Sequence, residues 1–149
     1  MEREFVLAPA MPEHLTGIME IETLCFAEEA FSRRQMAYLL SKAKGEFYVI
    51  CHNQQVAAYI SMVSRSNASN LRIYSIAVHP GARGHHLATA LLDKSVEYAR
   101  SHQLYSITLE VHTTNKAALA LYTKSGFQII TVKPGYYHNG DAYYMKKML

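Results

Sequence analysis

Apolar residues recur at helical spacing in the first third of the chain. They stand three or four positions apart from Leu15 to Cys25, which predicts an amphipathic helix. A second apolar stripe runs from Met36 to Leu40 and follows Ser32, a residue suited to cap a helix N-terminus. The segment Ala27 to Phe31 between the two stripes is predicted to be a loop, and Gly45 is predicted to end the second helix.

Two further helices are predicted later in the chain. One apolar face extends from Leu87 to Ala99 and predicts a long helix. A shorter pattern from Asn115 to Ser125 predicts another, with Thr114 near its N-cap and Gly126 at its C-terminal stop.

Seven short runs rich in β-branched and aromatic residues predict strands. The hairpin between the last two is predicted to turn at Asn139-Gly140. The strand–helix–strand crossover that begins at Leu71 makes its two strands parallel neighbours, whereas short polar connections make the preceding strands antiparallel. The predicted order is β-α-α-β-β-β-α-β-α-β-β, an α/β (α+β) fold with a mixed, mostly antiparallel sheet. The predicted strands are Phe5–Ala8, Phe47–Cys51, Val56–Val63, Leu71–Val78, Ser106–Val111, Phe127–Val132 and Ala142–Met148.

Length and composition favour one globular domain over residues 1–149. Half of the residues are hydrophobic and 18% are charged, the balance of a soluble protein. The chain has no apolar run long enough to span a membrane, and its acidic start does not resemble a secretory signal. We therefore expect a cytoplasmic location and no membrane partner.

The residue types exclude several kinds of chemistry. Cys25 and Cys51 are too few for a disulfide scaffold and are expected to be buried free thiols. The net charge of +3 is spread along the chain, so a nucleic acid partner is not expected. The eight histidines and two cysteines form neither a His-x-x-x-His nor a Cys-x-x-Cys motif, so no metal site is expected.

The segment from Tyr74 to Ala88 carries the first candidate chemistry. A strand gives way to a short basic loop that contains glycine, and a helix then begins. Unpaired amide groups and a partial positive charge at a helix N-terminus bind phosphate. An ordinary strand–helix connection explains the spacing equally well, and the Gly-Lys-Ser/Thr of an ATP-binding loop is absent.

Two motifs resemble those of the GNAT superfamily of N-acetyltransferases. Arg83-x-x-His86-x-Ala88 is similar to motif A of that family, usually written Gln/Arg-x-x-Gly-x-Gly/Ala. The later pattern Asn-x-x-Ala-x-x-Leu-Tyr-x-x-x-Gly-Phe, from Asn115 to Phe127, resembles motif B and is hard to obtain by chance. Within the superfamily, the chain most resembles the ribosomal-protein-alanine N-acetyltransferases (RimI type).

The resemblance implies a GNAT fold, acetyl-CoA as co-substrate and direct transfer of the acetyl group to an amine. It assigns Glu110 as general base, directly or through water, and Tyr122 as general acid beside the cofactor sulfur. From their type alone, a salt-bridged strand acid and a core aromatic would be the better interpretations of these two residues. The cofactor-binding residues that it implies are Ile76, Ala77, Val78, Arg83, Gly84, His85, His86, Leu87, Ala88, Asn115 and Tyr122.

One position departs from the family pattern. His86 stands where glycine is usual, and its bulk weakens the case for tight cofactor binding. We expect a right-handed helical backbone at His86, a conformation that does not require glycine. The amide groups from Gly84 to Ala88 would then remain available.

The acceptor side is less well defined. The resemblance implies that Phe31, Glu110, Tyr136 and Tyr137 line a site for the amine, although paired tyrosines also suit simple edge-strand packing. His112 projects from the same strand face as Glu110 and is either a second base or a histidine without a role, the latter being favoured.

A protein or peptide N-terminal α-amine is the expected acceptor. An α-amine has a pKa of about 7.7–8.0 against about 10.4 for lysine, so it needs less help from a base. The alternatives are a GNAT enzyme that acetylates small-molecule amines or lysine side chains, and a non-catalytic acyl-CoA-binding module. The sequence does not determine the oligomeric state.

Overall fold

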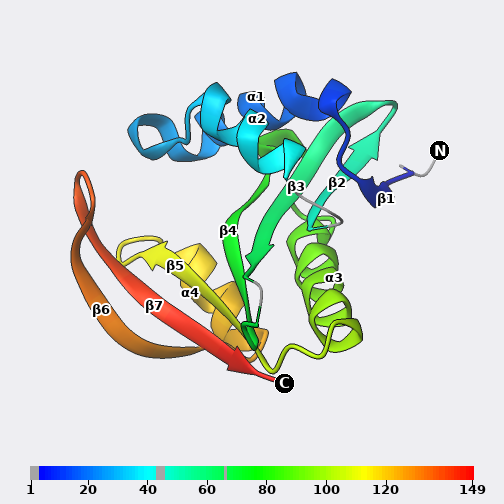
Figure 1. The fold of residues 1–149 in the computed structure, drawn as a ribbon. Helices are drawn as coiled ribbons and strands as arrows, with labels where there is room; N and C mark the ends of the chain where they lie inside the picture. Colours follow the sequence, from blue (N-terminus) through cyan, green and yellow to red (C-terminus); the bar gives the residue numbers. More distant parts are fainter. Residues whose placement is uncertain (1–3, 43–45, 66) are drawn as a thin grey trace. The chain divides into compact units, whose positions relative to one another are not determined.

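This computed structural model describes residues 4–42, 46–65 and 67–149. In these residues the helices and strands follow one another in the predicted order (Figure 1). Short 3₁₀ helices precede α1, α2 and α3. None of the helices in the described residues is long and apolar enough to cross a membrane. The main elements are β1 Val6–Pro9, α1 Leu15–Phe26, α2 Arg33–Ser41, β2 Phe47–His52, β3 Gln55–Ser64, β4 Asn70–Val78, α3 Leu87–Ser101, β5 Ser106–His112, α4 Lys116–Lys124, β6 Gln128–Tyr137 and β7 Gly140–Met148.

The chain divides into two compact units. The first contains Met1–Met62 and Ser75–Leu91, and the second contains Val63–Tyr74 and Leu92–Leu149. Neighbouring strands follow the order β1-β2-β3-β4-β5-β7-β6. The predicted mixed, mostly antiparallel sheet is thereby confirmed. The expectation of one domain over residues 1–149 stays a prediction.

In the first unit, β1, β2 and β3 pair in antiparallel fashion beside α1 and α2. The turn between β2 and β3 uses Asn53 and Gln54 with φ of 51° and 65°, the left-handed pair that a tight hairpin needs. Side chains from both helices and the sheet form one hydrophobic cluster, because each element has a single apolar face. The cluster contains Ile18, Ile21, Met36, Phe47, Val49, Tyr59 and Ala77.

The predicted cap of α2 is confirmed. The Ser32 hydroxyl accepts a hydrogen bond from the Gln35 amide, and the Gln35 side chain accepts one from the Ser32 amide, which forms a capping box. The helix ends at Ser41, and the predicted stop at Gly45 lies outside the described residues. The segment from Ala27 to Phe31, predicted to be a loop, begins with a 3₁₀ turn over Ala27–Glu29.

A buried carboxylate joins α1 to the rest of the first unit. Glu22 is 1% exposed, and its Oε1 accepts hydrogen bonds from the hydroxyls of Tyr59 on β3 and Ser75 on β4. Its Oε2 accepts a 2.8 Å hydrogen bond from the backbone amide of Phe31. Three neutral donors thus compensate the loss of water around the carboxylate.

In the second unit, β5 is the central strand. It pairs in parallel with β4 through Asn70↔Ser106, Leu71↔Ile107 and Arg72↔Thr108, which confirms the predicted crossover. On its other side it pairs with β7 in antiparallel fashion from Ser106↔Met148 to His112↔Ala142.

The β6–β7 hairpin is longer than predicted, and its turn lies elsewhere (Figure 1). Strand β6 continues through Pro134 and Gly135 to Tyr137, so the two-residue turn is His138-Asn139 rather than Asn139-Gly140. Because β6 is an edge strand, a proline and a register shift between Lys133 and Tyr137 are tolerated there.

Gly140 has a packing role instead of a turn role. A Cβ atom at this position would lie 2.6 Å from the His112 ring, so only glycine allows the imidazole to approach this closely.

Helix α4 begins one residue later than predicted. Asn115, not Thr114, is the N-cap, because its Oδ1 accepts a hydrogen bond from the Ala118 amide at 3.2 Å. The predicted stop is confirmed, since Gly126 follows the helix with φ of 97°.

The Glu22 network generates a stability prediction. Replacing Glu22 with alanine leaves the Phe31 amide and two hydroxyls without their acceptor. The free energy of unfolding should fall by about 3 kcal/mol or more, as measured by urea denaturation. The matched control is Glu20→Ala on the same helix, whose side chain is 65% exposed and should change stability by less than about 0.5 kcal/mol. Equal stability of the two variants would contradict the network's role.

Candidate active site

The predicted phosphate-binding segment lies in the first unit, between β4 and α3. The His79 ring accepts a 2.9 Å hydrogen bond from the Gly81 amide and starts a 3₁₀ turn over Pro80–Ala82. Arg83 is extended, Gly84 has φ of 87°, and α3 begins at Leu87.

The start of α3 presents free helical amides. Its first backbone hydrogen bond is donated by the Ala90 amide to the His86 carbonyl at 3.1 Å. The amides of Leu87, Ala88 and Thr89 therefore have no acceptor within the helix, and they form a positively polarised end. Such an end attracts anions in general, and the exposed Gly84 nearby has no heavy atom within 4 Å of where a Cβ would stand.

His86 adopts a backbone conformation that the sequence analysis did not expect. Its φ is 59°, which is left-handed rather than right-handed helical. The reason is that the chain must reverse after Gly84 before α3 can begin, so the residue that precedes the helix takes a positive φ. Glycine adopts this conformation without strain, whereas an L-residue pays roughly 1–2 kcal/mol.

The last residues of β4 lead into this segment. Ala77 faces the core of the first unit, so Ile76 and Val78 point to the opposite side. The Val78 carbonyl accepts a hydrogen bond from the Cys25 thiol at 3.4 Å, and Arg83 approaches the same sulfur at 3.9 Å. Burial raises the pKa of Cys25, so this half-buried thiol stays protonated at neutral pH.

Phe31 also belongs to the first unit. Its ring packs against the hydrophobic cluster that contains Ile18 and Met36, and its amide is held by Glu22. Phe31 therefore has a fixed backbone position next to the N-terminus of α2.

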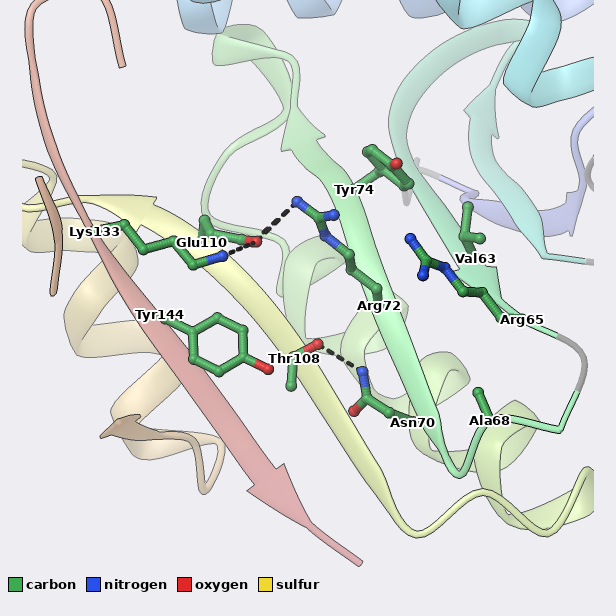
Figure 2. Close-up of a pocket in the computed structure, with 10 residues that line it drawn as sticks. All are labelled: Val63, Arg65, Ala68, Asn70, Arg72, Tyr74, Thr108, Glu110, Lys133 and Tyr144. Carbon is green, nitrogen blue, oxygen red and sulfur yellow. Dashed lines mark hydrogen bonds and ion pairs between the residues drawn. The ribbon is translucent and has the colours of Figure 1, made fainter. Parts of the chain in front are cut away.

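Glu110 is the centre of a charged pocket in the second unit (Figure 2). Its side chain is only 5% exposed, and its Oε1 lies 2.8 Å from Arg72 Nη2 and 3.3 Å from Lys133 Nζ. Arg72 Nη2 also donates to the Tyr136 hydroxyl at 3.1 Å. The pocket has a volume of about 370 Å³ and is lined by Val63, Arg65, Ala68, Asn70, Arg72, Tyr74, Thr108, Glu110, Lys133 and Tyr144.

The two tyrosines of the hairpin have different surroundings. Tyr136 reaches the charged pocket, where burial and the negative charge of Glu110 raise the pKa of its hydroxyl. Tyr137 stacks on His112 with ring centres 5.2 Å apart. The Nδ1 atom of His112 accepts hydrogen bonds from the amide and the hydroxyl of Thr114. Its Nε2 atom forms a hydrogen bond with Asn139 Oδ1, so both ring nitrogens have partners. The interpretation that His112 has no catalytic role stays a prediction.

Tyr122 lies on α4, also in the second unit. It is 7% exposed and packs edge-on against Phe127 with ring centres 5.9 Å apart. Burial raises the pKa of its hydroxyl well above the usual value, and the nearby Tyr137 adds to the shift. The hydroxyl therefore keeps its proton at neutral pH, although the raised pKa also makes it a weaker acid.

The predicted site residues thus form two groups. The first unit holds Phe31, Ile76 to Val78 and the segment from Arg83 to Ala88. The second unit holds Glu110, Asn115, Tyr122, Tyr136 and Tyr137. Within the second unit, Glu110 and Tyr136 meet through Arg72, whereas the Asn115 side chain is engaged in capping α4. The roles assigned to all of these residues stay predictions.

Sequence reasoning missed Arg72 and Lys133, the partners of Glu110. A signal was available, because Arg72 interrupts an apolar strand that was expected to lie beside the strand of Glu110. Charged residues on two neighbouring buried strands are expected to pair. In the described residues, no three His, Cys, Asp or Glu side chains are grouped so that they could hold a metal ion.

A mixed sheet and a helix that begins after a glycine-containing loop at the end of β4 define an α/β protein. Residues 15–127 match the model of the acetyltransferase (GNAT) family. The chain belongs to this family.

Individual relatives carry more specific names. The chain is 36% identical over 92 residues, 60% of its length, to the N-alpha-acetyltransferase RimI of Mycobacterium tuberculosis. It is 30% identical to an N-alpha-acetyltransferase of Saccharolobus solfataricus over an aligned length of 163 residues, which covers 99% of this chain and 95% of the relative. The chain spans 56% of the M. tuberculosis relative and 25% of a related Mycobacterium leprae protein.

Solved structures agree with the fold. Ard1 from Thermoplasma volcanium superposes with a TM-score of 0.91 at 25% identity over 97% of both chains. A chain of the NatC complex bound to Gag peptide and CoA superposes with a TM-score of 0.86 at 25% identity, over 98% of this chain and 99% of that chain.

The conformation of His86 generates a second prediction. His86→Gly removes the cost of the left-handed backbone but adds freedom to the unfolded chain. The net gain in the free energy of unfolding should be about 0.5–1 kcal/mol, measured by urea denaturation. Arg83→Gly is the control, because Arg83 has φ of −67° and glycine there should lower stability. A loss of stability in His86→Gly would mean that the backbone at position 86 is not strained.

Proposed function

We propose that this protein is an acetyl-CoA-dependent N-acetyltransferase that acetylates the N-terminal α-amine of a protein or peptide. Membership of the GNAT family and the names of the relatives support the reaction class. The observation that carries the proposal is a carboxylate, Glu110, in a pocket on the central strand of the second unit. The free thiols Cys25 and Cys51 suit a reducing compartment, so we propose that the enzyme acts in the cytoplasm.

The residues of the first unit fit the pantetheine and phosphate parts of acetyl-CoA. The amides of Leu87, Ala88 and Thr89 would receive the pyrophosphate, and the exposed Arg83 would add a guanidinium group. Gly84 leaves room for close approach, and the end of β4 at Ile76 to Val78 would align the pantetheine arm. When bound, the thioester supplies the acetyl group, and CoA leaves as a thiolate.

Glu110 is proposed to receive the proton that the amine loses. Its side chain lines the pocket, and its Oε1 lies 2.8 Å from Arg72 Nη2 and 3.3 Å from Lys133 Nζ. An α-amine demands little of a base, because its pKa of about 7.7–8.0 leaves a substantial minority of the molecules neutral near pH 7.

Tyr122 is proposed to protonate the leaving thiolate. In the described residues, no protein group forms a hydrogen bond with its hydroxyl, so the proton is not committed elsewhere. Its raised pKa keeps the proton in place before the thiolate forms, and it also makes the transfer to a thiolate, whose thiol has a pKa of about 8.5, less favourable.

The role of Tyr122 gives a kinetic prediction. Tyr122→Phe removes only the hydroxyl, so kcat should fall by roughly 100-fold or more while the Kd for acetyl-CoA changes little. Steady-state kinetics and calorimetry measure the two quantities. Tyr105→Phe is the control, because the side chain of Tyr105 is exposed and lies outside the proposed site. Full activity of Tyr122→Phe on a verified acceptor would show that another group supplies the proton.

The choice of acceptor gives a further prediction. A peptide with a free N-terminus and an internal lysine should be acetylated chiefly at the N-terminus, as located by fragmentation in a mass spectrometer. Parallel reactions with lysine peptides and small amines complete the screen. Label on lysine, or only on a small amine, would replace the proposed acceptor class. Binding of acetyl-CoA without transfer to any amine would indicate a non-catalytic binding module.

A further inference from the structure

The pocket around Glu110 holds more positive charge than its own carboxylate can neutralise. Arg65, Arg72 and Lys133 all line it, whereas Glu110 is the only acid in the lining. Arg72 and Lys133 both pair with Oε1 of Glu110, and Arg72 also reaches Oε2 at 3.4 Å. A third cation therefore remains without a negative partner inside the pocket.

Arg65 is that cation. Its guanidinium group has no ion pair or hydrogen bond to any side chain or backbone group in the described residues. Figure 2 shows its side chain extending from the end of β3 toward Arg72. Two guanidinium groups that share a pocket repel each other unless an anion lies between or beside them.

Arg72 also has unused donors. All of its hydrogen bonds to Glu110 and Tyr136 involve Nη2, and its buried Nε has no partner in the described residues. A guanidinium carries five N–H donors in a planar fork that matches a carboxylate. The pocket therefore offers unfilled donors together with uncompensated charge, and an oxyanion would satisfy both.

We propose that this cationic pocket selects acceptors that carry a carboxylate close to the amine that is acetylated. The inference rests on the proposed function, because Glu110 receives the amine in the same pocket. An extended chain advances about 3.3–3.6 Å per residue, so an acidic side chain among the first few residues of a peptide stays within reach. A free amino acid with an acidic side chain would present the same chemistry.

The test compares four matched acceptors in the intact protein. Three peptides share a neutral sequence and differ only in carrying Asp, Asn or Lys at positions two and three, and the fourth acceptor is free aspartate. We expect kcat/KM for the Asp peptide to exceed that for the Asn peptide by about tenfold, with the Lys peptide lowest. The preference should shrink as ionic strength rises.

Arg65→Gln is the decisive variant. It should lower the ratio of kcat/KM for the Asp peptide to kcat/KM for the Asn peptide to near one, and this ratio is measured within the variant itself. Arg65→Lys should keep part of the preference. Arg100→Gln is the control, because Arg100 is an exposed cation on α3 outside the pocket, and this variant should behave like the wild type.

The outcomes separate this inference from the proposed function. Equal N-terminal acetylation of all three peptides would overturn the carboxylate selection and leave the acetyltransferase proposal intact. Acetylation of free aspartate alone, lost in Arg65→Gln, would support the anion site while overturning the peptide acceptor. No transfer to any of the four acceptors would overturn both.

Discussion

The ion pairs of Glu110 are the interaction on which the second unit and its pocket depend. A carboxylate that is 5% exposed is costly to bury unless cations and donors replace its water, and here Arg72 from β4 and Lys133 from β6 do so. One buried charge on the central strand thereby fixes the side chains of the strands around it. The same arrangement places the carboxylate proposed to accept the proton at the wall of a cavity.

The first unit solves a similar problem with neutral groups. Within the part of the chain that the structure describes, Glu22 forms no ion pair and is satisfied by two hydroxyls and the Phe31 amide. Because that amide lies just before α2, the buried carboxylate determines how the chain passes from α1 to α2. The oxygen atoms of Glu22 are satisfied by neutral donors of the protein, whereas the pocket of the second unit holds more cations than carboxylates and so leaves an excess of positive charge that a ligand can neutralise. This contrast is the reason that the pocket, and not the Glu22 network, is the candidate for ligand selection.

The segment after β4 shows how backbone geometry limits the choice of residues. The chain reverses between Arg83 and Leu87 through two residues of positive φ, Gly84 and His86. Glycine at the first position adopts this conformation without strain, whereas histidine at the second retains a strained backbone. The amides at the start of α3 come from the helix and not from any side chain, so the proposed anion binding does not depend on the residue at position 86.

The sequence by itself determined the order of elements, the parallel pairing across the crossover and the family motifs, because apolar periodicity and turn chemistry are local properties that do not require a partner. Even Ser32 as a cap could be assigned, since a capping box closes within four residues.

Only the tertiary structure decided that β6 continues through Pro134, that His86 has a positive φ, and that Glu110 meets Arg72 and Lys133. An edge strand tolerates proline only because of its place in the sheet, and a buried charge finds its partners across 38 and 23 residues of sequence. Contacts at such separations depend on the pairing of strands that are distant in the sequence, and the side-chain partners in that pairing cannot be assigned from one segment alone.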